Sequence, residues 1–108
     1  MYITNFHNKR FQKTLDFLNQ HIDKGSHILD LGVQNPLAEL MKAYGHKVQN
    51  TQGEDLDENQ TVLANSKAEV VTAFEILEHL VSPYQVLKSI KAQKLLASVP
   101  LNLWFSSA

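Results

Sequence analysis

The segment Asp30-Leu31-Gly32 closes a short apolar run and carries the first candidates for chemistry. A carboxylate at that position can accept hydrogen bonds from a ligand amine or hydroxyl. The glycine lets the backbone turn sharply and lets a ligand come close to it. The alternative is structural: Asp30 caps the following turn, and Gly32 supplies only backbone freedom. Both interpretations predict a strand that ends at this segment.

The segment Glu75-Ile-Leu-Glu78-His79 holds two carboxylates and an imidazole close together. Oxygen and nitrogen ligands of this kind suit magnesium, manganese or zinc. A complete site usually needs a further ligand, and no histidine follows this one in the sequence. The pattern also differs from the His-x-x-Glu-His of zinc proteases, because position 75 is glutamate. Metal binding is therefore one hypothesis for this segment, and the identity of a metal stays open.

The apolar patterns along the chain predict the elements that position these residues. Helical spacing predicts an amphipathic helix over residues 5–23. A buried strand over 27–32 follows, and then a helix that begins at Pro36 and ends at Gly45. A weaker strand over 46–51 completes a strand–helix–strand unit, the minimum for a right-handed parallel crossover.

The second half of the chain repeats this alternation after a polar, acidic loop. It predicts two strands, a helix and a last strand, over residues 61–64, 69–74, 83–93 and 95–99. Alternating short strands and helices predict an α/β fold with a doubly wound, mainly parallel sheet. Ligands bind such sheets beyond the carboxyl ends of the strands, near the switch in strand order. We expect Asp30, Gly32, residues 50–55 and residues 74–79 at that edge.

Three segments, in this order, resemble motifs of the class I S-adenosylmethionine-dependent methyltransferases: Ile28–Gly32, Ala73–Pro83 and Ala97–Pro100. The most specific part is the Glu75-to-His79 segment followed by Pro83. It looks like the fourth-strand motif of the ubiquinone-biosynthesis O-methyltransferase group. The resemblance implies a Rossmann-like, partial methyltransferase domain over residues 26–108, preceded by an N-terminal helix over residues 1–25.

The resemblance further implies where the cofactor, S-adenosylmethionine, would bind. Asp30 and Gly32 would lie under its methionine moiety, and the loop through Gln34 would approach its carboxylate. Gln52 stands where the family has the acid that holds the ribose hydroxyls. Glu54 or Asp55, a few residues on, can take that role only if the loop folds back.

The resemblance places the reacting groups at the end of the strand over 69–74. Phe74 and Glu75 would face the sulfonium and the substrate entrance, with His79 beside the methyl acceptor. Methyl transfer requires alignment of acceptor and sulfonium, and a base that removes the acceptor's proton helps it. His79 is our candidate base, because the unperturbed pKa of histidine is near neutrality. The alternative for His79 is a structural role in the loop. In some relatives a similar Glu-x-x-Glu-His helps hold a divalent metal.

Two rival functions stay open at this point. A dinucleotide-binding domain shares the strand–loop–helix arrangement, but its Gly-x-Gly-x-x-Gly pattern lacks the last two glycines here. A non-catalytic binding or interaction module would keep the fold without the cofactor. Gln34 and Pro36, which replace two glycines of the family, and Gln52 favour that module.

Composition narrows the functional classes. The chain has 108 residues, 44% of them hydrophobic, and a net charge of −1 from 10 basic and 11 acidic side chains. That balance does not indicate nucleic-acid or anionic-lipid binding. The absence of cysteine excludes disulfides, a thiolate zinc site and a cysteine nucleophile, and it fits a cytoplasmic location. No membrane span, phosphate-binding Walker loop or hydrolase nucleophile elbow occurs in the sequence.

The length suggests that the chain is a fragment. The resemblance implies a larger sheet, whose last strands would follow residue 108. A small variant is the alternative, in which the open sheet edge is covered by a second copy in a homodimer. We expect a small molecule or another, unidentified methyl acceptor as partner. Trp104 and Phe105 are expected to pack, or to cover a substrate pocket.

Overall fold

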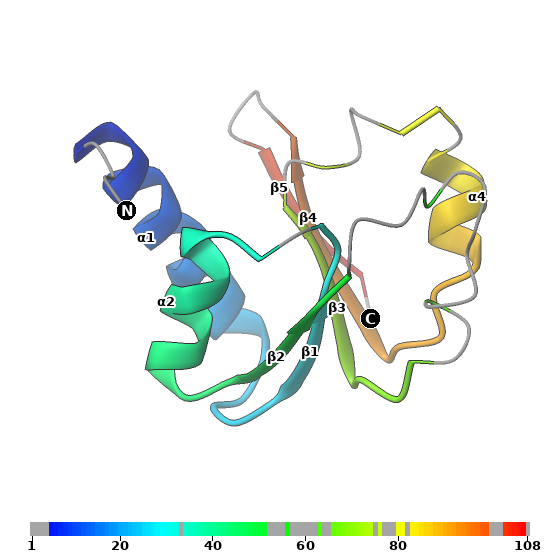
Figure 1. Cartoon of the computed structure of the whole chain (residues 1–108), viewed down its shortest axis with the longest axis horizontal. Helices are drawn as coiled ribbons and strands as arrows, with labels where there is room; N and C mark the ends of the chain where they lie inside the picture. Colours follow the sequence, from blue (N-terminus) through cyan, green and yellow to red (C-terminus); the bar gives the residue numbers. More distant parts are fainter. Residues whose placement is uncertain are drawn as a thin grey trace.

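The structure, a computed structural model, describes residues 5–32, 34–51, 56, 63, 66–74, 76, 80–81, 83–99 and 103–107. They form a five-stranded sheet flanked by helices (Figure 1). The strands are β1 (His27–Asp30), β2 (Lys47–Asn50), β3 (Val70–Phe74), β4 (Lys94–Val99) and β5 (Leu103–Ser107). The helices are α1 (Asn5–His21), α2 (Pro36–Tyr44) and α4 (Pro83–Lys88). The strand order is β2-β1-β3-β4-β5; β5 is antiparallel to β4, and the others are parallel.

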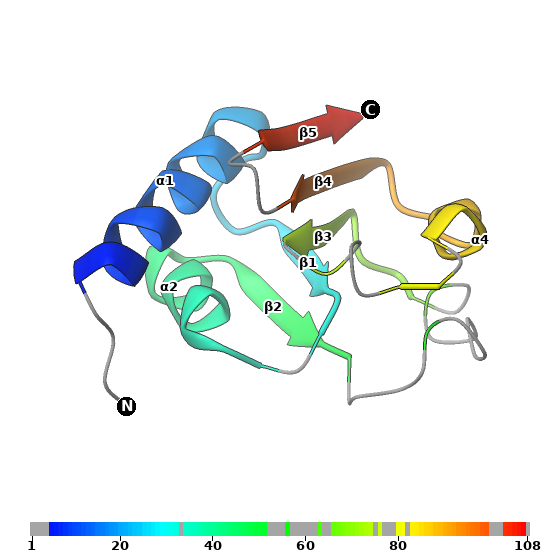
Figure 2. The same ribbon diagram turned by 90° about the horizontal axis from the view of Figure 1, so that it is seen from above.

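Helices lie on both faces of the sheet. α1 and α2 cover one face, and α4 lies on the other (Figure 2). β1 and β3 are buried along nearly their whole length, because parallel strands between two layers have no face turned to solvent. The predicted α/β class and the mainly parallel sheet are thus confirmed.

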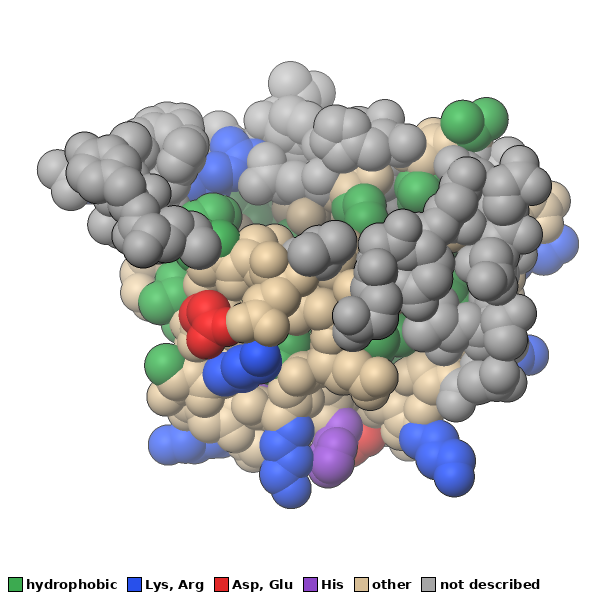
Figure 3. Space-filling model, viewed as in Figure 1, with side chains coloured by type: hydrophobic (Ala, Val, Ile, Leu, Met, Phe, Trp, Pro, Cys, Tyr) green, Lys and Arg blue, Asp and Glu red, His purple; other side chains and the backbone are tan. Residues whose placement is uncertain are grey.

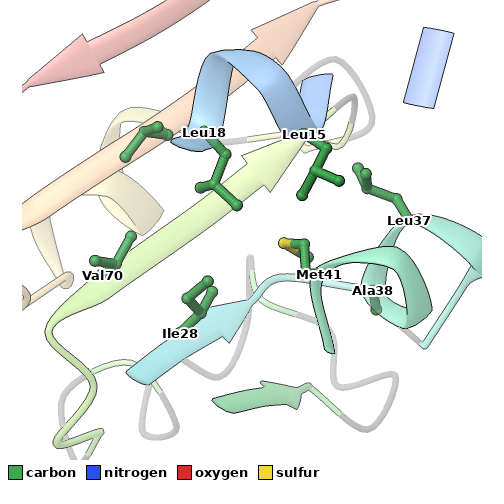
Figure 4. Packing of buried hydrophobic residues seen from close by; sticks show 8 residues of the cluster. Leu15, Leu18, Ile28, Leu37, Ala38, Met41 and Val70 are labelled. Carbon is green, nitrogen blue, oxygen red and sulfur yellow. The ribbon is translucent and has the colours of Figure 1, made fainter. Parts of the chain in front are cut away.

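The first core lies between the sheet and the pair α1 and α2. Leu15 and Leu18 of α1 point toward Met41 of α2 and toward Ile28 and Val70 of the sheet (Figure 4). All five side chains are at most 6% exposed. α1 therefore shares its core with the segment over 26–108.

The second core lies on the opposite face, because successive strand residues point to opposite sides. Leu29 and Val71 pack there with Val86 of α4 and with Leu56 and Leu63. Leu63 is helical. The predicted strand over 61–64 is wrong at this position, and its other residues lie outside the described part. A short apolar run does not distinguish a buried strand from a buried helical turn.

Both ends of α2 are formed by residues that are typical of helix ends. The Asn35 side chain accepts a hydrogen bond from the N–H of Ala38 at 3.0 Å, and Pro36 occupies the first turn. Gly45 ends the helix at φ +124°, where its N–H donates to the carbonyl of Lys42. The predicted start and stop of this helix are confirmed.

Two helices are shorter than the periodicity predicts. α1 ends at His21, and the chain then turns as Ser26 donates from both its N–H and its hydroxyl to the carbonyl of Asp23. α4 ends at Lys88. The N–H of Ile90 then donates to the carbonyl of Leu87, three residues earlier, at 3.2 Å. Apolar spacing continues past both ends because the following residues still pack against the cores.

β5 is an element that the sequence patterns did not predict. It pairs antiparallel with β4 and is the last strand of the sheet on that side. Its Trp104 indole N–H donates to the Thr14 hydroxyl of α1 at 3.1 Å, and its ring lies 6.4 Å from that of Phe17. Trp104 therefore packs on α1, as the packing interpretation predicts, while the side chain of Phe105 lies outside the described part.

Replacing Trp104 with phenylalanine tests this contact. The change keeps an aromatic ring but removes the bond to Thr14, whose hydroxyl still donates to the Arg10 carbonyl. We expect the free energy of unfolding to fall by about 1 kcal/mol. Urea denaturation followed by circular dichroism measures it, and an unchanged midpoint would show that β5 gains nothing from this bond.

Candidate ligand-binding edge at the carboxyl ends of the strands

The carboxyl ends of β1, β2 and β3 meet at one edge of the sheet. Asp30 is in register with Asn50 on one side and with Thr72 on the other. The chain leaves β1 toward α2 and β2 on one side, whereas β3 lies on the other side. The strand order thus reverses between the neighbouring strands β1 and β3. Open α/β sheets bind ligands beyond the strand ends at such a point.

Asp30 is held inside the protein at this edge. Its side chain is 3% exposed. One carboxylate oxygen accepts from the Thr72 hydroxyl at 2.6 Å, and the other accepts from the Asn50 amide at 2.8 Å. Both oxygens are engaged by the protein itself, so Asp30 positions its neighbours and presents no free oxygen to a ligand.

Burial has the largest effect on the pKa of the Asp30 carboxyl. Loss of water raises the pKa of its carboxyl from 3.8 to about 6, although the bonds from Thr72 and Asn50 act in the opposite direction. The side chain is therefore ionised at neutral pH and takes up a proton in mildly acidic solution.

Gly32 makes the turn that leaves the strand. Its φ is +110°, which favours glycine, and a Cβ placed there would lie 3.6 Å from the Ile76 side chain. The N–H of Gly32 donates to the Thr51 hydroxyl at 2.7 Å, and its carbonyl accepts from the Asn50 amide at 3.0 Å. The glycine turn is thus fixed on both sides by residues at the end of β2.

Asn50 belongs to the 50–55 segment that the sequence predicts at this edge, but its bonds to Asp30 and Gly32 were not predicted. Its amide donates to the Asp30 carboxylate, to the Asp30 carbonyl and to the Gly32 carbonyl. A polar residue at the end of a predicted parallel strand, next to another strand that ends in an acid, is the signal that points to it. Asn50 thus links the Asp30 carboxylate to the Gly32 turn.

The loop into α2 fits a cofactor carboxylate only in part. Gln34 is exposed beside the helix start. Pro36 has no N–H, and the N–H of Ala38 is already bonded to Asn35. The N-terminus of α2 is therefore capped from within, and the glycine turn, rather than this helix end, is the feature that fits a closely approaching ligand.

Phe74 lies at the end of β3, as expected, and is half-buried. It packs against the first core, on the side of α1 and α2. Part of its ring is therefore used for packing.

The other predicted site residues lie outside the described part of the chain: Gln52, Asp55, Glu75, Glu78 and His79. Ile76 and Leu80, which flank residues 77–79, pack against the second core on the face that carries α4. Among the described residues, no three acidic or histidine side chains are placed to hold a metal ion. The roles predicted for Glu75 and His79 remain predictions.

No protein-family model, curated protein or solved structure matches the chain. Within the described residues, no helix is both long and apolar enough to span a lipid bilayer.

Proposed function

We propose that the chain is the cofactor-binding part of a class I S-adenosylmethionine-dependent methyltransferase with a Rossmann-like fold. The observation that carries the proposal is the Gly32 turn, which Asn50 and Thr51 fix at the switch between β1 and β3. This is where a doubly wound sheet brings its backbone close to a ligand. The resemblance of the segments around Gly32 and Glu75 supplies the identity of the cofactor and the reaction.

The residues divide between holding the cofactor and moving a proton. Gly32 gives the cofactor a close approach to the backbone, and Asp30 acts indirectly by holding Asn50 against the turn. Gln34 and Phe74 border the same edge, and we assign Gln52 and Asp55 to the ribose side. S-adenosylmethionine supplies an electrophilic methyl group.

Catalysis is assigned to the segment that follows β3. We assign His79 as the base that accepts the proton lost by the methyl acceptor, and Glu75 as a residue of the substrate side. The acceptor, a small molecule or a larger partner, approaches from beyond the strand ends.

Calorimetry with S-adenosylmethionine, its demethylated product and NAD tests the proposal. We expect both adenosyl compounds to bind and NAD not to bind. Gly32→Ala should weaken cofactor binding at least about tenfold, because a side chain at φ +110° strains the turn that the cofactor approaches.

Gly25→Ala is the matched control. Gly25 also has a positive φ, +86°, but it lies before β1, at the opposite end of the strand, and no atom stands near its Cβ position. The two variants carry similar backbone strain. Equal losses of cofactor affinity in both would show that Gly32 is not part of the binding site.

The second candidate function is a non-catalytic binding module. The closed Asp30 network and the internally capped α2 favour it, because both use groups that a cofactor would otherwise contact. A folded chain that binds neither adenosyl compound would overturn the methyltransferase proposal and support this module. Binding of NAD would instead support a dinucleotide-binding domain.

A further inference from the structure

A cavity of about 850 Å³ opens at the opposite end of the strands, where β1 and β2 begin. His27 and Lys47, which are paired in register, line it from the sheet. The described lining is completed by Lys42 and His46, by further residues of β1 and β2 as far as Leu29 and Gln49, and by residues 66–68 before β3. The volume is within the range of small-molecule sites.

The described lining is cationic. It contains three lysines and two histidines but no carboxylate: His27, Lys42, His46, Lys47 and Lys67. Figure 3 shows separate Lys or Arg side chains along the lower rim of this face, with a histidine and an acidic side chain between two of them. The whole chain has a net charge of only −1, so the described lining is a local excess of positive charge.

Neighbouring carboxylates leave most of this charge unneutralised. Glu39 lies 3.9 Å from Lys42, in an exposed pair, and Glu69 accepts from the backbone N–H of His27 at 3.3 Å. Lys47 and Lys67 make no ion pair within the described part of the chain. Within the described residues, these two ammonium groups therefore have no carboxylate partner.

The walls also contain fixed polar and apolar groups. His46 is 4% exposed, and its Nε2 bonds to the Asn19 amide oxygen at 2.8 Å. Its Nδ1 is buried and has no hydrogen-bond partner among the described residues. Val48 and Ala68 supply apolar lining. A ligand here therefore needs an anionic group and an organic body.

We propose that this cavity binds an organic phosphomonoester of about nucleotide size, with Lys42, Lys47 and Lys67 supplying the charge. Lysine binds phosphate as a point charge, and several ammonium groups match a dianion better than a single carboxylate. The cavity is too large for inorganic phosphate alone, so the organic body contributes to binding.

The described lining of this cavity does not include Asp30, Asn50 or Gly32. β1 has four residues, and His27 and Asp30 stand at its two ends, about 10 Å apart along the strand. The lining extends along β1 and β2 as far as Leu29 and Gln49, one residue before Asp30 and Asn50. The phosphomonoester proposal does not rest on the methyltransferase proposal.

A titration of the isotope-labelled chain with AMP, followed by NMR, tests the inference. We expect the amide signals of residues 47–49 and 66–68 to shift. Adenosine and inorganic phosphate, used alone, should each bind at least about tenfold more weakly than AMP. Equal affinity of AMP and inorganic phosphate would overturn the proposal.

Paired charge variants give the control. Lys47→Gln with Lys67→Gln should weaken AMP binding about tenfold. Lys13→Gln with Lys91→Gln removes the same charge at exposed positions outside the cavity lining, and should change the affinity less than about twofold. Equal losses in both pairs, or shifts centred on Gly32, would overturn the site. Gly32→Ala should retain AMP binding, which separates failure of this proposal from failure of the proposed function.

Discussion

Replacing Asp30 with asparagine is expected to flatten the pH dependence of stability between about pH 4 and pH 7. The folded chain raises the pKa of this carboxyl from 3.8 to about 6, so the folded state binds a proton more tightly than the unfolded state. Stability from this group is fully present below pH 3.8 and is lost as the pH rises through about 6. The difference between these two pKa values corresponds to about 3 kcal/mol in the free energy of unfolding. Urea unfolding of both proteins across this pH range measures it.

Asp23→Asn makes the same chemical change at an exposed side chain and is expected to keep the wild-type pH profile. Asp30→Asn also places an amide N–H₂ against that of Asn50, so a constant loss of stability at all pH values is expected in addition. The diagnostic quantity is therefore the slope of stability against pH. Parallel profiles of Asp30→Asn and the wild type would show that Asp30 does not titrate as its burial requires.

The site explains why the chain keeps a buried acid that weakens the fold at neutral pH. Without the Asp30 carboxylate, the Thr72 hydroxyl and the Asn50 amide would each lose an acceptor. Asn50 also holds the carbonyl of Gly32, so the acid, the amide and the turn form one unit. We infer that Asp30 acts through Asn50 to set the backbone path at the ligand edge.

The elements that the sequence predicts well are those with local causes. The helix between Pro36 and Gly45 has a cap, a proline and a glycine at its ends, and the strands that end at Asp30 and Phe74 are short apolar runs. Such signals need no knowledge of the remaining chain. They are sufficient for the α/β class and for the edge where Asp30 and Gly32 lie.

What the sequence does not predict depends on distant partners. Trp104 bonds to Thr14, 90 residues away, and Thr72 bonds to Asp30, 42 residues away. β5 follows a proline and shows no clear alternation, so only its pairing with β4 reveals it. Residues 50–55 were expected at this edge, but the bonds of Asn50 to Asp30 and Gly32 depend on the register of β2 with β1, which no single segment encodes.

Replacing Leu18 with alanine is expected to have the largest effect among changes outside the ligand edge. Leu18 is fully buried in the first core, between α1 and the residues of β1, β3 and α2. Removing its isobutyl group should lower the free energy of unfolding by about 3 kcal/mol, since the lost transfer energy adds to the cost of the cavity. Because small domains are only marginally stable, this loss is a large fraction of the total. Thermal and urea denaturation measure it.

Gln20→Ala provides the control on the same helix, because Gln20 is exposed and its loss should change stability by less than about 0.5 kcal/mol. The comparison decides whether α1 belongs to the core of the sheet or is an appendage before it. If α1 belongs to the core, Leu18→Ala lowers the midpoint of a single transition that includes the sheet. If the sheet unfolded at the same midpoint in Leu18→Ala and in the wild type, α1 would be an independent segment. The sheet, with both candidate sites, would then have to be stable without it.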